Sequence, residues 1–330
     1  MTPKDILIYR GRIIESRHRV IFSVKDIYNN NILSTNKQNQ LIYPRSAIKI
    51  FQALPFIKSN AHKLFKLNKK NIAIACSSHS GENIHIHVLE NWLKKIHINI
   101  NQLKCGIHNP LNEKISNNLL LSGQKPNQLH NNCSGKHLAM ISGCLANKIT
   151  YKNYNQFHHP YQSLIRESLE YFMKTKIKKN CIGKDGCNAP QYAFPLKNIA
   201  QSMINLIKEK EQKSIYANAI NTVLESIKKY PFLIGGKSRF DSELIKITEG
   251  RIFCKGGAEG VLLFADFSKK IGGAIKVIDG NNRAIPSITM EIFSKLKLLS
   301  RKEIRDLDNW KNQILFNHDK KNIGKIEAKL

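Results

Sequence analysis

The sequence has no apolar run near the roughly 20 residues that a membrane-spanning helix needs, so we expect no membrane partner. Its beginning, MTPKDILIYRGR, has no charged segment followed by an apolar one, which is the pattern of a secretory signal. These two absences lead us to expect a cytoplasmic protein.

The cysteines have no disulfide pattern. There are 7 of them, an odd number at irregular spacing, and they do not follow the paired spacing of zinc fingers. In a cytoplasmic chain, such cysteines are more typical of metal binding, of catalysis, or of burial as small apolar groups. We expect most of the thiols to be buried.

Acidic residues are scarce. The chain has 24 Asp and Glu against 53 Lys and Arg, a net charge of +29, which would ordinarily suggest nucleic-acid binding. However, the lysines are spread along the whole chain with many Asn and Ile, and no RNP-type aromatic motif or basic heptad region is present. Because Lys, Asn and Ile share AT-rich codons, genome composition accounts for the charge. We expect no specific nucleic-acid partner.

Strand patterns lie at both ends of the sequence and helical patterns lie between them. Residues 5–26 and about 251–282 are typical of short strands joined by turns, and the final IGKIEAKL adds one more strand. The strongest helical patterns cover 163–177 and 201–230, where apolar residues recur at intervals of three and four.

This order favours the α+β class in one domain. We expect an antiparallel sheet built from both termini, about residues 1–70 and 231–330, with a helical central subdomain at about 71–230.

Reactive side chains gather in a few short clusters. In chain order they are Ser46–Lys49, Ser77–Glu82, Asn132–His137, Asp185–Cys187 and Lys255–Gly260. Each cluster alone is equally typical of a turn or a helix cap. Their order, however, follows the layout of penicillin-recognising enzymes, which use Ser-x-x-Lys, a serine loop and a late Lys-x-Gly strand. In that chemistry Ser46 attacks a carbonyl, Lys49 takes its proton and a second serine relays protons.

Seven stretches make the resemblance more specific. They are YPRSAIKIFQALP, SSHSGE, NNCSGKHLAM, DGCNAP, FLIGGKSRFDSELI, CKGGAEGV and KVIDGNNRA. In this order the chain resembles the Rhizobium etli-type L-asparaginase family, also called asparaginase II, from about Arg10 to Ala284. The resemblance implies a serine β-lactamase and glutaminase-like fold, a homodimer, and hydrolysis of the small molecule L-asparagine to L-aspartate and ammonia.

The resemblance also implies catalytic residues. Ser46 and Lys49 would form one Ser–Lys pair, Ser78 would be the second serine, and Lys255 would be the lysine that faces them. Ser46 fits the Ser-x-x-Lys logic of a nucleophile, but Ser78 belongs to the same expected network and could exchange roles with it.

A zinc ion is a further implication, held by Cys133, Lys136 and Cys187, with Asp185 and His137 close by. From the residues alone, the set would be Cys133, His137 and Cys187, because Cys and His suit zinc and i, i+4 spacing places two ligands on one helix face. Lysine is a poor ligand on general grounds because its ammonium must first lose a proton.

Four further residues are candidates for substrate binding: Arg45, His79, Arg239 and Asp241. Arg239 and Asp241 would bind the substrate α-carboxylate or form a structural ion pair with each other. Arg45 has the same two interpretations. His79, between two serines, would either orient its loop or donate a hydrogen bond to the substrate.

Two rival functions remain open from the sequence. A penicillin-recognising serine hydrolase or peptidase would use the same Ser-x-x-Lys motif and would be acylated by a β-lactam at Ser46. A basic nucleic-acid-binding protein would explain the charge, but it would leave the clustered Ser, Lys and Cys residues unexplained.

Overall fold

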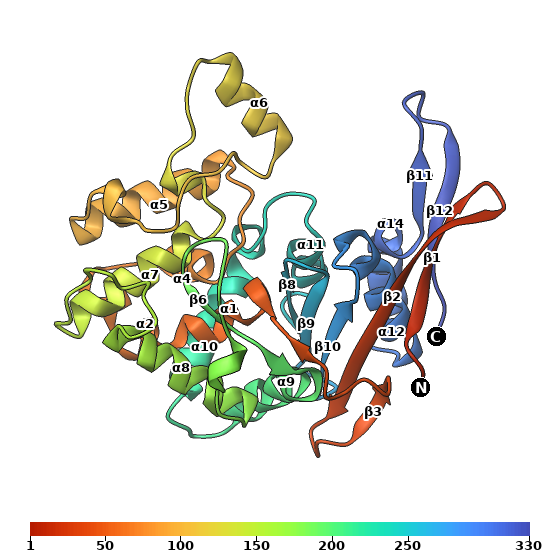
Figure 1. Cartoon of the computed structure of the whole chain (residues 1–330), viewed down its shortest axis with the longest axis horizontal. Helices are drawn as coiled ribbons and strands as arrows, with labels where there is room; N and C mark the ends of the chain where they lie inside the picture. The colour runs from red at the N-terminus through yellow and green to blue at the C-terminus, as the bar shows by residue number, and fades with distance from the viewer. The chain divides into compact units, whose positions relative to one another are not determined.

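The computed structural model describes residues 1–330, which divide into two compact units (Figure 1). The first, called the sheet unit, comprises Met1–Ala47, Phe194–Ile207 and Glu243–Leu330; the second, called the helical unit, comprises Ile48–Ala193 and Lys208–Ser242. The helical unit thus begins at residue 48, earlier than the expected 71. The segment Phe194–Ile207, which was expected in the helical part, belongs to the sheet unit. The single-domain organisation stays a prediction.

The sheet unit is built on one antiparallel sheet in which the two ends of the chain are neighbours. The strand order is β11-β12-β1-β2-β10-β9-β8, and β3 also pairs with β2. The strands are β1 (Lys4–Arg10), β2 (Ile13–Asp26), β3 (Asn31–Ser34), β8 (Ile252–Gly257), β9 (Val261–Asp266), β10 (Ile271–Val277), β11 (Gln313–Phe316) and β12 (Asn322–Ala328). Because β1 pairs along its length with β12, the prediction of a sheet from both termini, closed by a C-terminal strand, is confirmed.

Helices cover both faces of this sheet. A Cβ added at Gly272 would lie 2.7 Å from the Cβ of Met203, so α9 (Leu196–Glu211) packs closely on one face. Gly273 points to the opposite face, where Phe264 meets Phe293 of α12 (Ile285–Lys295) with ring centroids 4.8 Å apart. Every residue of β9 is buried, as a strand covered on both faces should be.

Shorter elements complete the sheet unit. They are the pair β4 (Leu41–Ile42) and β7 (Phe194–Pro195), the 3₁₀ turns η1 (Arg45–Ile48) and η6 (Asn282–Ala284), and helices α11 (Phe240–Ile247), α13 (Arg301–Asp306) and α14 (Asp308–Lys311). Two of these elements, η1 and α11, lie where the chain passes between the units.

The helical unit is built around one buried helix, α7 (Ser134–Ala146), against which most of the other helices pack. Its helices are α1 (Lys49–Gln52), α2 (Leu54–Lys58), α3 (Ala61–Leu64), α4 (Lys69–Ala75), α5 (Asn83–Ile96), α6 (Glu113–Leu121), α7, α8 (Pro160–Met173) and α10 (Ala217–Lys229), with 3₁₀ turns η2 (Ile100–Gln102), η3 (Gln128–His130), η4 (Lys179–Cys181) and η5 (Pro231–Leu233). A small hairpin joins β5 (Ile182–Lys184) to β6 (Pro190–Tyr192). Helix α6 differs from the others because none of its residues is buried.

The strongest helical patterns of the sequence are present with one change. The pattern at 163–177 lies within or beside α8, but the pattern at 201–230 is interrupted between α9 and α10. Ser214 causes the interruption, because its Oγ accepts hydrogen bonds from the N–H groups of Tyr216 and Ala217 and so starts a new helix.

The fold therefore confirms an α+β protein with a sheet from both termini and a helical central part. All seven cysteines are free and buried, which confirms that the thiols are buried. No helix combines the length and the apolar character that crossing a bilayer requires.

Candidate functional site

Two reactive segments of the helical unit meet where α4 ends and α7 begins. Ser77 and Ser78 follow α4, and Cys133 directly precedes α7. Gly135, in the first turn of α7, makes the approach possible, because a Cβ there would lie only 2.2 Å from the carbonyl oxygen of Ile74. Since that contact is with backbone, no side-chain adjustment would relieve it.

Lys49 joins these two segments. Its ammonium is fully buried and donates to the carbonyl oxygen of Ser77, to Ser78 Oγ at 3.1 Å and to Cys133 Sγ at 3.0 Å. Burial lowers the pKa of Lys49, and the nearby charge of Lys136 lowers it further. The helical unit therefore places a lysine amine within hydrogen-bond distance of a serine hydroxyl.

Two neutral histidines hold the serine loop. The N–H groups of Gly81 and Glu82 donate to Nδ1 of His79 and of His85, at 3.2 and 3.1 Å, so each ring carries its proton on Nε2. His79 Nε2 then donates to Ser134 Oγ at 2.9 Å, at the start of α7. Burial lowers the pKa of both rings. His79 thus contacts both its own loop and the start of α7, and its two expected roles stay predictions.

Glu82 ties the same loop to a second segment. Its Oε1 accepts from Ser80 Oγ at 2.7 Å and from the N–H of Lys237 at 3.0 Å. A Cβ at Gly236 would lie 2.1 Å from Ser80 Oγ, so only glycine fits beside this pair. The loop after Ser78 is therefore fixed on both sides.

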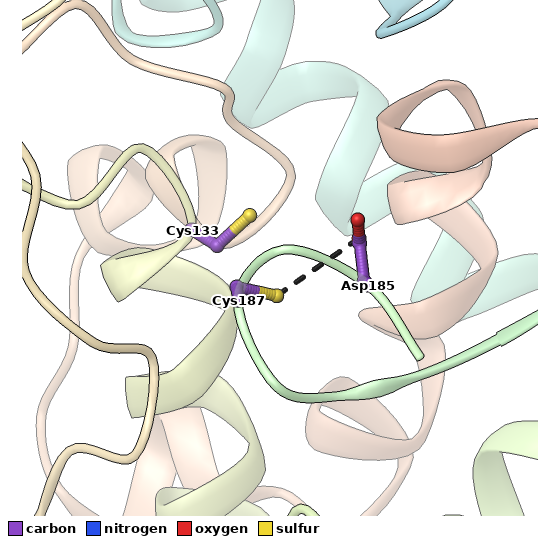
Figure 2. Close-up of side chains that lie close together, drawn as sticks. All are labelled: Cys133, Asp185 and Cys187. Carbon is purple, nitrogen blue, oxygen red and sulfur yellow. Dashed lines mark hydrogen bonds between the residues drawn. The ribbon is translucent and has the colours of Figure 1, made fainter. Parts of the chain in front are cut away.

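A compact set of metal-ligand atoms lies next to Lys49. Ligand atoms of Cys133, Asp185 and Cys187, all buried, lie within 4.8 Å of one another (Figure 2). Cys187 Sγ is 3.9 Å from Asp185 Oδ2, the contact drawn dashed, and Lys136 Nζ lies 3.7 Å from the same carboxylate. The structure thus brings together all three predicted zinc ligands and Asp185.

The charges of this set depend on one another. A hydrogen bond from the Cys133 thiol lowers the pKa of Cys187 to about 5, and the same bond, with burial, raises the pKa of Cys133. Burial alone would lower the pKa of Lys136, but Cys187, Cys133 and Asp185 together raise it. The pKa of Cys187 is therefore lowered and that of Lys136 raised by their proximity to each other.

His137 lies at the edge of this cluster. Its Nδ1 is 2.6 Å from Tyr154 Oη, whereas its buried Nε2 has no hydrogen-bond partner. Burial, and then the charge of Lys136, lower the pKa of His137 to about 3, so the ring is neutral. Two thiols and a carboxylate whose ligand atoms lie within 4.8 Å of one another form a donor set that fits zinc.

The sheet unit holds the other predicted catalytic residues. Ser46 lies in η1 directly after Arg45, whose φ of 51° is in the left-handed region that non-glycine residues rarely adopt. A Cβ at Gly257 would lie 2.5 Å from the carbonyl oxygen of Pro44, so the strand that carries Lys255 runs against the turn that carries Ser46. Lys255 is buried, and its Nζ donates to the carbonyl oxygen of Gly256 at 3.0 Å.

The boundary between the units falls between Ser46 and Lys49, so their pairing stays a prediction. The substrate roles of Arg45, Arg239 and Asp241 likewise stay predictions. Within the helical unit, half-buried Arg239 and buried Asp241 both pack against Gly235, and Asp241 Oδ1 accepts from the N–H of Ser242 at 3.1 Å.

Sequence reasoning missed two parts of the site. Tyr154 comes from a polar stretch with no motif, and Lys104–Asn112 has only scattered polar residues, so neither gave a signal. Both touch residues beside the thiol cluster, as Tyr154 does through His137.

Comparison with known proteins agrees with the sequence motifs. The L-asparaginase II family model matches residues 6–328. None of the curated proteins matches the chain. Among solved structures, the chain is similar to a presumed beta-lactamase from Bacteroides dorei DSM 17855, with 8% identity, coverage of 78% of this chain and 84% of that one, and a TM-score of 0.41.

The family match spans nearly the whole chain and includes every reactive cluster described above. The chain therefore belongs to the L-asparaginase II family and is an enzyme of the asparaginase type, an amidohydrolase.

Proposed function

We propose that the protein hydrolyses L-asparagine to L-aspartate and ammonia through an acyl-enzyme formed on a serine, with Lys49 as the base. The observation that carries this proposal is the 3.1 Å distance from Lys49 Nζ to Ser78 Oγ in a fully buried site. A serine within hydrogen-bond distance of an amine is the arrangement that activates a hydroxyl for attack on a carbonyl.

The contacts of Lys49 suit this role. An ammonium has three N–H donors, and here the three acceptors are Ser77 O, Ser78 Oγ and Cys133 Sγ. The neutral amine keeps two donors for Ser77 and Cys133 and turns its lone pair toward Ser78. Lys49 is thus held in place in both protonation states.

The proposed steps conserve atoms and charge. The serine Oγ bonds to the side-chain amide carbon of asparagine while Lys49 takes the hydroxyl proton, and the lysine then gives a proton to the departing ammonia. Water attacks the resulting ester by the same route, and aspartate leaves. Either Ser78 or Ser46 would be the serine that forms the ester, with the other relaying protons and Lys255 supplying a second cation.

We also propose zinc as a cofactor, held by Cys133, Cys187 and Lys136, with Asp185 beside them. When bound, the ion would supply a positive charge that attracts a substrate carboxylate. Lys136 would have to lose its proton to act as a ligand, and its ion pair with Asp185 opposes that loss. The homodimer implied by the family stays a prediction.

The test is ammonia release from L-asparagine and, in parallel, from L-glutamine by wild type, Ser46→Ala and Ser78→Ala. A covalent aspartyl adduct, trapped by acid quench and located by mass spectrometry, would identify the ester-forming serine. The proposal would be supported if wild type releases ammonia from asparagine and either substitution abolishes this release. No release by a folded, zinc-loaded wild type would overturn it, and acylation of Ser46 by a β-lactam would then support the rival hydrolase.

A further inference from the structure

The segment Lys104–Asn112, between η2 and α6, has no helix or strand of its own, yet it makes polar contacts with every reactive loop of the helical unit. It is called the 104–112 segment below. Loops without regular structure usually satisfy their backbone groups with water, so contacts with three separate reactive loops require an explanation.

The beginning of the segment is attached beside Cys187 and His137. The N–H of Lys104 donates to Tyr154 Oη at 2.9 Å, and that hydroxyl lies against His137. The carbonyl oxygen of Lys104 accepts from Asn188 Nδ2 at 3.2 Å, one residue after Cys187. The backbone of Lys104 therefore links Tyr154, which contacts His137, with Asn188, which follows Cys187.

The middle of the segment is attached beside Cys133. Asn131 Nδ2 donates to the carbonyl oxygen of Cys105 at 2.9 Å, and the N–H of Asn132 donates to His108 Nε2 at 2.9 Å. His108 Nδ1 is 2.6 Å from the carbonyl oxygen of Asn109, which accepts its proton, so Nε2 is free to accept. A side chain of the segment thus fixes the peptide between Asn131 and Asn132, one residue before Cys133.

The end of the segment is attached to the serine loop. The N–H of Asn112 donates to the carbonyl oxygen of Ser80 at 2.9 Å, and Pro110 packs so closely on Gly81 that a Cβ there would lie 2.9 Å from the proline Cβ. Gly81 also has φ of 77°, which glycine adopts without strain.

We propose that His108 is a positioning residue that sets the orientation of Cys133, so that the 104–112 segment aligns the thiol cluster with the serine loop. This inference rests on the proposed zinc site. The side chain of His108 accepts a hydrogen bond from the backbone of Asn132, next to the proposed ligand Cys133. A substitution at His108 can therefore remove this contact without altering the backbone. Loss of a partner that orients a ligand typically weakens metal binding by about 10- to 100-fold.

The test uses Co²⁺ as the probe in the full-length chain. We compare His108→Leu, which removes the acceptor, with His108→Gln, whose side-chain oxygen can replace Nε2. The matched control is His87→Leu, because His87 Nε2 also accepts a hydrogen bond, from Asn91 at 3.0 Å, but on the exposed face of α5. The readouts are the thiolate-to-Co²⁺ charge-transfer absorption, the Co²⁺ affinity and the midpoint of urea unfolding.

We expect His108→Leu to weaken Co²⁺ binding by about 10-fold or more and to reduce the charge-transfer band, with rescue by His108→Gln and no change in His87→Leu. Equal Co²⁺ affinity in His108→Leu and wild type would overturn the inference, as would absence of the band from wild type. Weaker binding that His108→Gln does not rescue would also overturn it. Because these readouts need no substrate, an inactive wild type that keeps the His108 effect would contradict only the proposed function.

Discussion

Lys49 Nζ lies 3.1 Å from Ser78 Oγ, although the two residues are 29 positions apart, the first at the start of α1 and the second in the loop after α4. The amine also contacts Cys133, so one buried cation connects the serine loop with the thiol cluster. The proposed site thus has two neighbouring parts, the Lys49–Ser78 pair for acyl transfer and the thiol cluster for zinc. Substitutions in each part can separate their roles.

Replacing Lys49 should affect turnover above all. We expect Lys49→Ala to lower kcat by about 10³-fold, since loss of a general base typically costs 10²- to 10⁴-fold. Lys49→Met serves as a second variant, because it keeps most of the buried volume and removes only the amine. Ammonia release at saturating asparagine checks the prediction, and kcat within a factor of three of wild type in both variants would contradict it.

Replacing Cys187 should affect binding above all. We expect Cys187→Ala to weaken zinc binding at least about 10-fold and to raise KM for asparagine, because the thiolate is a direct ligand in the proposed site. Competition with a chromogenic chelator measures the zinc affinity, and steady-state kinetics at saturating zinc measures KM. Equal, mild losses of kcat in Cys187→Ala and Lys49→Ala would show that the two roles are not separate.

Adding a methyl group at Gly135 should destabilise the helical unit. Its Cβ would lie 2.2 Å from the carbonyl oxygen of Ile74, so α7 would have to move away from α4. Overpacking of this kind typically costs about 1–3 kcal/mol, and we expect Gly135→Ala near the upper end. Gly186→Ala is the control, because a Cβ there meets nothing within 4 Å. The midpoint of urea unfolding is measured for Gly135→Ala and Gly186→Ala. Equal midpoints would refute the packing argument.

The buried histidines should make the protein less stable in mild acid. Burial lowers the pKa of His85 in the folded state from 6.5, so the unfolded chain binds a proton first as pH falls. The stability from neutral His85 is therefore complete above pH 6.5 and is lost as pH falls from 6.5 toward the folded pKa. The slope is at most about 1.4 kcal/mol per pH unit.

His85→Gln tests this pH dependence. A glutamine does not titrate, yet it can still accept the N–H of Glu82 in a capping box. Between pH 7.5 and 5.5, the unfolding free energy of wild type should fall more than that of His85→Gln. Parallel curves for the two proteins would show that His85 does not contribute.

The sheet could be predicted from the sequence because its strands carry local signals. Alternating and apolar runs mark β1, β2 and β12, and pairing the two chain ends is the simplest way to bury them. The break between α9 and α10 was missed, because one serine that starts a new helix is a weak signal inside a long apolar pattern.

The site could be predicted only where a motif exists. Cys133, Lys136 and Cys187 were expected together, and they do lie together, with Asp185. The contact of Lys49 with Cys133 was not expected, because it joins residues 84 positions apart and no local pattern encodes such a distance. Tyr154 and His108 were missed for the same reason, since both act through single long-range hydrogen bonds.

Helix α6 has a practical consequence for those who work with this enzyme. None of its residues is buried, and Leu120 and Leu121 at its end are 78% and 85% exposed. Exposed tips of this kind accept insertions and fusions best. An affinity tag, a fluorescent domain or new chain termini made by circular permutation can therefore be introduced after Leu121, while the hydrogen bonds of the 104–112 segment keep the reactive loops in place.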